Sequence, residues 1–490
     1  MKPVAYLGID VGGTGAKVGV VDGEGHLLGF AHRPYRPRLS EEGHVEIPID
    51  TIYSATREAA LSAIRESGAR VAALSVASQG ETFVSLNDRD EPLHPAIVWY
   101  DARASEQADR LRKSLQTTPL QEAMPVVAPT YSAPKIMWLR EHFPELMAQA
   151  KRYLLLPDYL VYRLTGRAVT DPSTAASTGL YAQDAADYCV VALAATGICK
   201  GALAEIQKPG QPLARVLEKT AAQWGLDAET LVVTGTNDQL AGALGAGNCR
   251  TGIVSVTTGT CLDLITLTEK LPQPIPPGLL GGRFPIPQYQ YAEAFAKTAG
   301  VVLEWFNQEL SPDKSLRDLD EMASRVPTGS RGLMMLPHFD GMNSPMPDPD
   351  ARGAFLNLSL HHTCADMYRA TLEALGYTLN ECLELFRQSG FDINRVRAIG
   401  GAAKSDFWLQ MTADITGLSI ERPVMVEAAV LGAAMIAAVG FGALSSLQEG
   451  SEAFYKRARI FTPHTENHDV YEKLYGNHVR LYRHIYSRRT

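Results

Sequence analysis

The feature that most constrains this chain is a strand–turn–strand pattern that occurs twice, about half a chain apart. The first copy reads LGIDVGGTGAKVGVVD and the second reads IVSVTTGTCLDLIT; in each, an apolar run enters a turn of glycine and threonine, and a second apolar run follows. A pattern that recurs at matching positions predicts two structurally related halves. The stretch GAGNCRTG is rich in small residues, so we expect the boundary there and domains of residues 1–247 and 248–490.

Strand-like and helix-like stretches alternate around the two hairpins, which favours an α/β fold. In the first half, apolar runs predict strands at residues 4–9, 17–21, 71–77, 96–100 and 231–233. A helix is expected over residues 51–67, with Gly68 as its C-terminal cap. In the second half, the same reasoning predicts strands at residues 253–256, 262–267, 332–336 and 396–399, and a long helix at residues 365–386.

The composition fits a globular protein with more than one core. The chain has 490 residues, of which 46% are hydrophobic, and this length favours two domains. It carries 46 basic and 54 acidic residues, for a net charge of −8. Nucleic acids and anionic membranes both bind basic surfaces, so neither is expected as the main partner.

The cysteines and the apolar segments predict a cytoplasmic protein. The six cysteines include no CxxC pair, which indicates free thiols in a reducing compartment rather than a zinc site or a disulfide framework. Asp10 interrupts the first apolar run early, so the N-terminus has no secretory pattern. Residues 428–447 are rich in alanine and glycine, which predicts a closely packed buried helix rather than a membrane span.

The turn of the first hairpin is suited to bind an anion. It is built from small residues, Gly12, Gly13 and Gly15, so backbone N–H groups can approach a phosphate closely. Thr14 adds a hydroxyl and Lys17 a cation, and Asp10 at the strand end could hold magnesium directly or through water. The spacing fits neither GxxxxGK[ST] nor GxGxxG. A tight glycine turn beside a solvated carboxylate is the alternative reading.

Two further loops in the second half resemble nucleotide-contacting loops. The second hairpin turns through four small or hydroxylated residues, Thr257, Thr258, Gly259 and Thr260. Two such turns at matching positions suggest a phosphate chain gripped from both sides, although both could be simple hairpin turns. A third small-residue loop contains Gly400, Gly401, Ala402 and Lys404 and precedes a helix expected from residue 406. Its backbone could contact an adenosine, unless it serves only close strand–helix packing.

A candidate catalytic carboxylate follows the predicted strand at residues 231–233. Asp238 lies where the strand ends and a helix begins, so the helix dipole would favour its ionised form. Phosphoryl transfer needs one group to accept the proton of the attacking hydroxyl. An aspartate that merely caps the helix is the alternative.

Two segments resemble a pocket for a polyhydroxylated ligand. Residues 78–82 contain Gln79 and Glu81, and residues 99–103 contain Trp99 and Asp101. An aromatic ring can pack on the apolar face of a sugar while amides and carboxylates bind its hydroxyl groups. The alternative for Trp99 and its neighbour Tyr100 is a place in the core.

Taken together, these residues resemble the FGGY carbohydrate kinases, which include xylulose, glycerol, ribulose and gluconate kinases. The matching segments follow the family order over almost the whole chain: residues 10–17, 98–101, 134–139, 156–159, 170–173, 237–239, 257–260, 352–355 and 400–405. The resemblance implies two actin-like (ribonuclease H-like) ATPase domains flanking a central cleft, with ATP as phosphoryl donor and Mg²⁺ as metal.

The resemblance also implies roles for single residues. Asp238 would be the catalytic base and Asp10 the carboxylate on the magnesium side. The phosphate contacts would come from Thr14, Lys17, Thr258 and Thr260. The sugar site would be lined by Gln79, Glu81, Trp99, Asp101, Asp238 and Gln239.

The substrate is less sharply indicated than the chemistry. Glycerol kinases carry an arginine immediately before the position that resembles Glu81, whereas this chain has Gly80, and xylulose kinases usually show Met-His nearby. We expect a small sugar or polyol, with a xylulose-type ketopentose favoured and pentitols, tetritols and glycerol as alternatives. A homodimer is possible. The rival functions are an actin-like ATPase that acts as a scaffold or chaperone and a non-catalytic sugar-binding regulator.

Overall fold

The computed structural model describes residues 2–116, 126–183, 185–259 and 261–486, which form two compact units. The first unit comprises Met1–Gly247, Arg283–Pro287 and Ala429–Phe454. The second comprises Asn248–Gly282, Gln288–Ala428 and Tyr455–Thr490. Each unit has its own hydrophobic core around a mixed β-sheet.

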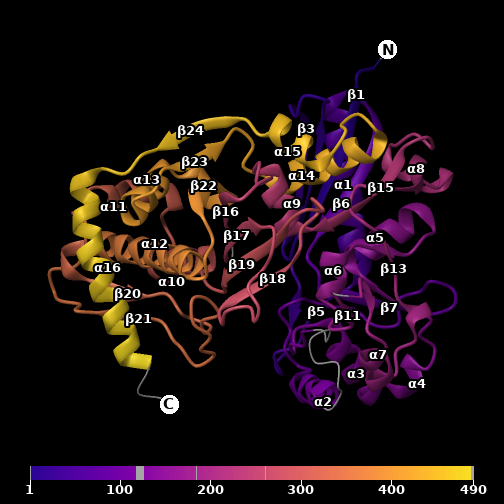
Figure 1. The fold of residues 1–490 in the computed structure, drawn as a ribbon, viewed down its shortest axis with the longest axis horizontal. Helices are drawn as coiled ribbons and strands as arrows, with labels where there is room; N and C mark the ends of the chain where they lie inside the picture. The colour runs from indigo at the N-terminus through magenta and orange to yellow at the C-terminus, as the bar shows by residue number, and fades with distance from the viewer. Residues whose placement is uncertain (1, 117–125, 184, 260, 487–490) are drawn as a thin grey trace. The chain divides into compact units, whose positions relative to one another are not determined.

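The first unit is centred on a six-stranded sheet (Figure 1). The strands, in spatial order, are β14 (Pro212–Arg215), β15 (Leu231–Asn237), β6 (Arg70–Ser78), β1 (Val4–Val11), β2 (Gly15–Val21) and β3 (Leu27–Pro34). The chain reverses between β1 and β2, whereas β6 runs parallel to both β1 and β15. The carboxyl ends of β1, β6 and β15 therefore meet at one edge.

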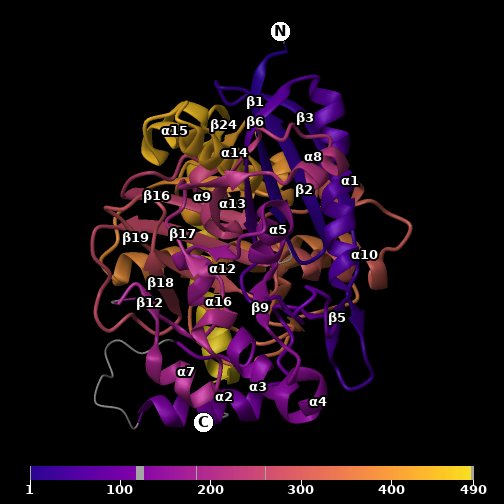
Figure 2. The ribbon, with the colours of Figure 1, turned by 90° about the vertical axis from the view of Figure 1, so that its right-hand side faces the viewer.

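Helices cover both faces of this sheet, which explains why β1 and β6 are buried along most of their length. On one face, α1 (Ile49–Ser67) lies along β2 and β3 (Figure 2), and a Cβ atom at Gly29 would lie 2.3 Å from the Ala63 carbonyl oxygen. On the other face, α14 (Ala428–Phe441) approaches so closely that a Cβ atom at Gly8 would lie 2.0 Å from the Val430 carbonyl oxygen. Glycine at both positions permits backbone-to-backbone packing.

The helix expected within residues 428–447 is α14, and residues 430–438 are buried. The prediction of a buried helix is confirmed. Among the helices of the described residues, none is both long enough and apolar enough to span a bilayer.

A smaller sheet adjoins the two segments expected to bind the sugar. Its strands, in order, are β4 (Arg38–Leu39), β5 (Val45–Ile47), β8 (Ala96–Ile97), β7 (Phe83–Leu86) and β9 (Arg152–Leu155). Residues 79–82 lead into β7, and residues 98–101 follow β8. The strand predicted for residues 96–100 was too long. It ends at Ile97 because the Val98 carbonyl oxygen accepts a hydrogen bond from the Asp101 N–H (3.1 Å), which closes a turn.

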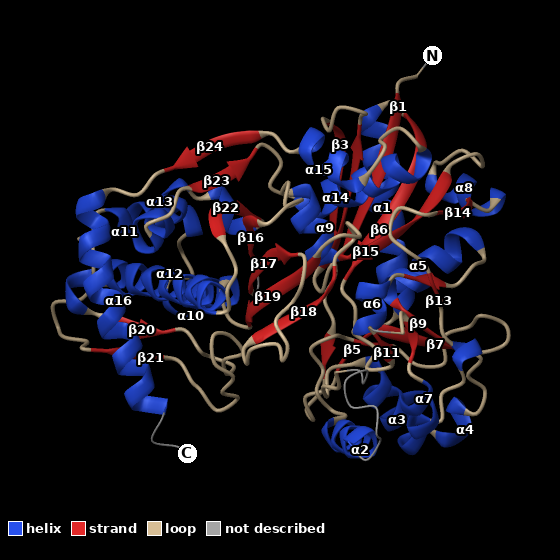
Figure 3. Ribbon diagram, in the orientation of Figure 1, coloured by secondary structure: helices blue, strands red, loops and turns tan. Residues whose placement is uncertain are grey.

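The second unit repeats the plan of the first with a seven-stranded sheet (Figure 3). The strands, in order, are β18 (Leu279–Arg283), β19 (Gln290–Ala296), β17 (Leu262–Thr268), β16 (Gly252–Thr258), β22 (Ile393–Ile399), β23 (Ile420–Pro423) and β24 (Arg457–Phe461). Here β16 pairs antiparallel with β17 and parallel with β22, as β1 pairs with β2 and β6.

The match extends one strand further, because β19 flanks β17 in the way that β3 flanks β2. The structural repeat predicted from the two hairpins is therefore confirmed. The main helices of this unit are α10 (Gly300–Leu310), α11 (Leu316–Ser324), α12 (Cys364–Gln388), α13 (Asp406–Thr416) and α16 (Thr465–Tyr486).

Candidate functional site

The candidate catalytic carboxylate, Asp238, and the candidate magnesium ligand, Asp10, lie at the same edge of the first sheet. Asp10 of β1 and Thr236 of β15 are both level with Ala77 of β6 in the strand register. Neighbouring strands are about 4.8 Å apart, so the ends of β1 and β15 are separated by roughly 10 Å, with β6 between them. Asp10 and Asp238 can therefore approach one small ligand from two strands.

Asp238 is the first residue of α9 (Asp238–Gly245), but it is not the residue that caps this helix. The side-chain oxygen of Asn237 caps it by accepting the Gln239 N–H at 2.9 Å. One Asp238 carboxylate oxygen also lies 2.9 Å from that N–H, and Asp238 is half-buried. The helix N-terminus stabilises negative charge, so it favours an ionised Asp238.

A buried carboxylate holds the end of β15 in place. Asp171 caps α6 (Pro172–Ala176) by accepting the Ser173 N–H at 2.9 Å, and it also accepts the Thr236 hydroxyl at 3.2 Å. The Ser173 hydroxyl in turn accepts the Asn237 N–H at 3.2 Å. Burial raises the pKa of Asp171, although its hydrogen bonds oppose this shift. Asp171 thus fixes the two residues that precede Asp238.

Tyr35, which follows β3, is a site residue that the sequence reasoning missed. Its hydroxyl donates a hydrogen bond to the Gly12 carbonyl oxygen, and its backbone N–H donates to the Thr14 carbonyl oxygen at 3.0 Å. Burial and the negative charges of Asp10 and Asp238 raise the pKa of Tyr35. Only the β2–β3 pairing brings Tyr35 to the glycine turn, so no local sequence signal could have identified it.

The glycine turn adjoins two of the predicted sugar-binding residues. The turn closes through a hydrogen bond from the Gly12 N–H to the Gly15 carbonyl oxygen at 3.1 Å. A Cβ atom at Gly13 would lie 3.2 Å from the indole nitrogen of Trp99 and 3.5 Å from the amide oxygen of Gln79. The structure therefore brings the predicted phosphate turn and the predicted sugar pocket together within the first unit.

The other residues of this turn differ in exposure. Thr14 is exposed at its tip, and Lys17 pairs with Asp10 in the β1–β2 register.

Gln79 and Glu81 follow β6 at the same sheet edge. Gln79 is 7% exposed, and among the described residues its side-chain oxygen has no hydrogen-bond partner. A buried acceptor without a partner is costly, so a ligand hydroxyl that donates to it would stabilise the site. Glu81 and Trp99 are half-buried beside it.

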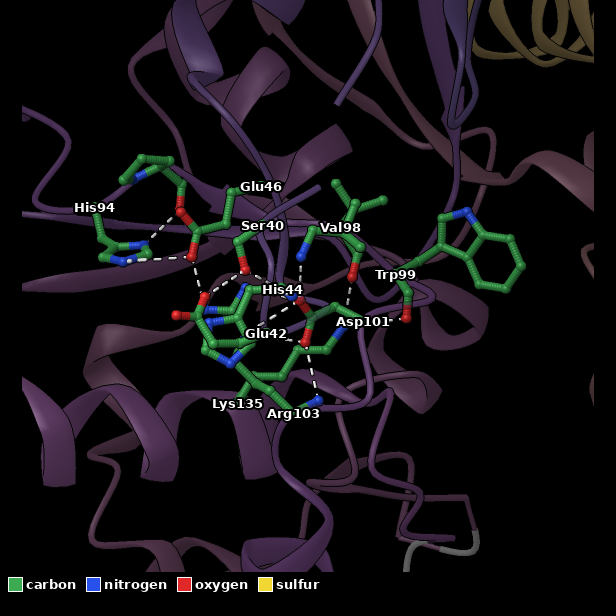
Figure 4. A network of polar contacts seen from close by, with 12 residues as sticks. Ser40, Glu42, His44, Glu46, His94, Val98, Trp99, Asp101, Arg103 and Lys135 are labelled. Carbon is green, nitrogen blue, oxygen red and sulfur yellow. Dashed lines mark hydrogen bonds and ion pairs between the residues drawn. The ribbon is translucent and has the colours of Figure 1, made fainter. Parts of the chain in front are cut away.

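Asp101 is 1% exposed and is engaged with protein donors on both carboxylate oxygens (Figure 4). It accepts the Val45 N–H at 2.6 Å, the Arg103 N–H at 3.0 Å and the Arg103 Nη2 at 2.7 Å. Burial alone would raise the pKa of Asp101, but the hydrogen bonds from Arg103 and Val45 bring it below its usual range. Its carboxylate therefore has a clear structural task in holding Arg103.

The second unit brings its two predicted nucleotide loops side by side. Thr257 and Thr258 end β16, and Gly400 directly follows the parallel strand β22. A Cβ atom at Gly400 would lie 3.2 Å from the Thr258 carbonyl oxygen, and its φ of 82° is a conformation that favours glycine. Gly259 is exposed, and Thr260 lies outside the described residues.

The loop after Gly400 leads into α13. A short 3₁₀ turn, Gly401–Lys404, contains Ala402 and precedes Ser405, whose hydroxyl accepts the Trp408 N–H at 3.1 Å as the cap of α13. The same hydroxyl donates to Asp320 of α11 at 2.6 Å. Lys404 is exposed, with its ammonium 3.4 Å from Glu427. The loop is thus fixed at both ends while Gly401 stays exposed.

The site in the first unit offers carboxylate oxygens that could bind Mg²⁺, but not a complete set of protein ligands for a metal ion. Across the described parts of the chain, no group of three or more His, Cys, Asp or Glu side chains is arranged to hold a metal ion. Mg²⁺ bound with a nucleotide commonly uses one or two carboxylates plus phosphate and water oxygens. Asp10, with Asp238 across the same sheet edge, fits that demand.

A glycine turn beside two strand-edge carboxylates can bind a phosphate group together with its Mg²⁺ ion. Residues 5–245 match the N-terminal domain of the FGGY family of carbohydrate kinases, and residues 252–441 match its C-terminal domain. The chain belongs to this family. It is therefore a carbohydrate kinase, which uses ATP to phosphorylate a hydroxyl group of a sugar or polyol.

Two curated relatives are similar to this chain along almost their full length. A xylulose kinase of Staphylococcus epidermidis is 28% identical and is aligned over 99% of this chain and 97% of its own. A glycerol kinase of Bordetella parapertussis is 31% identical, over 93% of this chain and 92% of its own.

Solved structures share the fold. A xylulose kinase from Lactobacillus acidophilus superposes with a TM-score of 0.87 at 24% identity, over 99% of this chain and 98% of its own. A gluconate kinase from the same organism gives 0.87 at 24% identity, covering 98% of each chain. A Plasmodium falciparum glycerol kinase, solved with ADP, gives 0.83 at 20% identity, covering 98% of each chain.

Proposed function

We propose that the protein phosphorylates an uncharged ketopentose of the xylulose type, with Asp238 as general base. The observation that carries this proposal is the common sheet edge, where Asp10 of β1 lies level with Thr236 of β15, two residues before Asp238. Gln79 and Trp99 lie over the adjoining glycine turn. A sugar hydroxyl bound against Gln79 and Trp99 would be near the carboxylate that deprotonates it.

In the proposed mechanism, a hydroxyl oxygen of the sugar attacks the γ-phosphorus of ATP, in line with the ADP oxygen that leaves. Asp238 accepts the proton of that hydroxyl during the attack. The N-terminus of α9 keeps Asp238 ionised and ready to accept the proton. The N–H groups of the glycine turn, with Thr14 and Lys17, stabilise negative charge on the transferring group. Magnesium, held beside Asp10, would neutralise charge on the phosphate oxygens.

We divide the tasks between the two predicted domains in the same way. Residues 1–247 would bind the sugar through Gln79, Glu81, Trp99 and Gln239, and they would supply the base. Residues 248–490 would bind the nucleotide. The adjacency of Gly400 and Thr258 supports this second task, because one nucleotide could contact both loops.

The charges around the proposed sugar site support an uncharged substrate rather than a sugar acid. Two cationic side chains, Lys135 and Arg103, lie near Asp101 in the described part of the chain. Arg103 binds Asp101 and Glu46, and Lys135 donates to two backbone carbonyl oxygens. A substrate carboxylate would find both cations engaged, so its desolvation would not be offset.

An ATP-to-ADP coupled assay across ketoses, aldoses, polyols and sugar acids tests this proposal. We expect sugar-dependent ADP formation, highest with a ketopentose and lowest with sugar acids. A preference for gluconate-type acids would contradict the proposed substrate class. Turnover of ATP that needs a protein partner instead of a sugar would favour a scaffold, and sugar binding without turnover would favour a regulator.

A further inference from the structure

A fully buried lysine lies behind the proposed sugar pocket. Lys135 is in the first turn of α3 (Ser132–His142), and its side chain is 0% exposed. Its ammonium donates to the carbonyl oxygens of Val98 at 2.8 Å and Trp99 at 3.1 Å (Figure 4). Burying an ammonium group is costly, so this position calls for an explanation in terms of its partners.

The first effect of Lys135 is on the backbone that carries Trp99. The Trp99 N–H donates to the Thr82 hydroxyl at 2.9 Å, while its carbonyl oxygen accepts from Lys135. The preceding residue is held as well, because the Val98 N–H donates to the Val45 carbonyl oxygen at 3.1 Å. The segment that leaves β8 is thus fixed on both sides of Trp99, and the indole nitrogen stays beside the turn at Gly13.

The second effect is electrostatic. The charged groups that act on Lys135 are Glu81, Asp101 and Arg103. Asp101 is already neutralised by the guanidinium of Arg103, at 2.7 Å. The ammonium group therefore lies in the field of two carboxylates, which favours its charged form and so strengthens its hydrogen bonds to the two carbonyl oxygens.

We propose that Lys135 is a positioning residue of the sugar site, which fixes the Trp99 peptide through the hydrogen bonds of its ammonium group. This inference rests on the proposed assignment of Trp99 to the sugar site. Lys135 itself touches no reacting atom, so it acts on sugar binding and not on the bond-making step.

The first test is Lys135→Met, which keeps an unbranched side chain of similar length but removes the donor and the charge. We expect KM for the sugar to rise at least tenfold, while KM for ATP stays within twofold of its original value. Lys113→Met on the exposed surface of α2 (Ser105–Gln116) is the matched control and should change neither constant. An unchanged sugar KM, or equal changes in both KM values, would overturn the inference.

A second test needs no substitution. Burial lowers the pKa of Lys135 to about 7, although the charges of Glu81 and Asp101 raise it and that of Arg103 lowers it further. The ammonium group therefore loses its proton as the pH rises through about 7, which weakens its hydrogen bonds to the Val98 and Trp99 carbonyl oxygens, and the sugar KM should increase between pH 6 and pH 8. A sugar KM that is constant over this range in the wild-type enzyme would contradict the role of the charge.

A third test is independent of catalysis. The chain has five tryptophans, so the emission of Trp99 is obtained as the difference between the protein and its Trp99→Phe variant. We expect acrylamide to quench this emission more strongly in the Lys135→Met background, because the Trp99 peptide has lost its donor. Equal quenching in the two backgrounds would refute the positioning role, whereas the failure of every sugar in the assay would refute only the proposed function.

Discussion

Gly80 lies between two predicted sugar-binding residues and has no room for a side chain. A Cβ atom at this position would lie 2.2 Å from the Ser177 Oγ and 2.8 Å from the Ser177 Cβ. Ser177 cannot move freely, because its hydroxyl donates to the Thr174 carbonyl oxygen at 2.7 Å. We therefore predict that Gly80→Ala destabilises the first unit.

The size of the effect follows from the clash. Inserting a methyl group into a packed site costs about 1–3 kcal/mol, and losing the Ser177 hydrogen bond adds roughly 1 kcal/mol. For a unit of this size, each kcal/mol lowers the melting temperature by about 2–4 °C. Gly80→Ala should thus lower the melting temperature of its unit by roughly 5–15 °C and raise the sugar KM as Gln79 and Glu81 shift.

Differential scanning calorimetry of a double-mutant cycle measures this directly. Ser177→Gly removes the clashing atoms, so Gly80→Ala with Ser177→Gly should be more stable than the sum of the single changes predicts, by about 1 kcal/mol or more. Gly23→Ala is the matched control, because a Cβ atom there would meet nothing within 4 Å. A Gly80→Ala protein as stable as the control, or fully additive single changes, would refute this reasoning.

Three further predictions concern single side chains. Tyr35→Phe keeps the ring but removes the hydroxyl that holds Gly12, so kcat/KM for ATP should fall about fivefold, the equivalent of roughly 1 kcal/mol; steady-state kinetics that match the wild type would disprove this. Asp171→Ala removes the cap of α6 and a hydrogen bond to Thr236, so it should lower the free energy of unfolding by at least about 1 kcal/mol and also lower kcat. If calorimetry and kinetics show neither change, Asp171 does not support the site. Burial lowers the pKa of His338 from 6.5 to about 4 and that of His478 from 6.5 to about 3. Below pH 6.5 the unfolded chain therefore binds protons at these histidines that the folded chain does not. The folded state loses stability as the pH falls in this range. Urea unfolding at pH 7 and at pH 5 measures this loss. Between the two pH values, the free energy of unfolding should fall less for His478→Leu than for the wild type, by up to about 1.4 kcal/mol per pH unit. An equal fall in both proteins would count against the effect.

Features with a local cause were predictable from the sequence. The helix expected over residues 51–67 is α1, Ile49–Ser67, and Gly68 caps it at a φ of 59°. The helix expected over residues 365–386 is α12, Cys364–Gln388. The strands of the first hairpin lie where the apolar runs placed them, because a continuous apolar run and the glycine turn that ends it are signals within a few residues.

Features that depend on tertiary contacts were not predictable. Tyr35 reaches the glycine turn only through strand pairing, and Ser177 meets Gly80 only because α6 lies against the end of β15. The partners of Asp101 are also distant, since Val45 precedes it by more than fifty residues. A sequence motif can suggest that a carboxylate faces a ligand, but only the fold shows which protein donors it already has.

The most direct measurement is the steady-state turnover of Asp238→Asn, together with its ATP affinity by isothermal titration calorimetry. The substitution keeps the size of the side chain at the start of α9 but removes the proton acceptor. We predict that kcat falls by at least about 100-fold while the ATP dissociation constant stays within a fewfold of the wild-type value. Turnover close to that of the wild type would show that another group accepts the proton and that Asp238 is not the catalytic base.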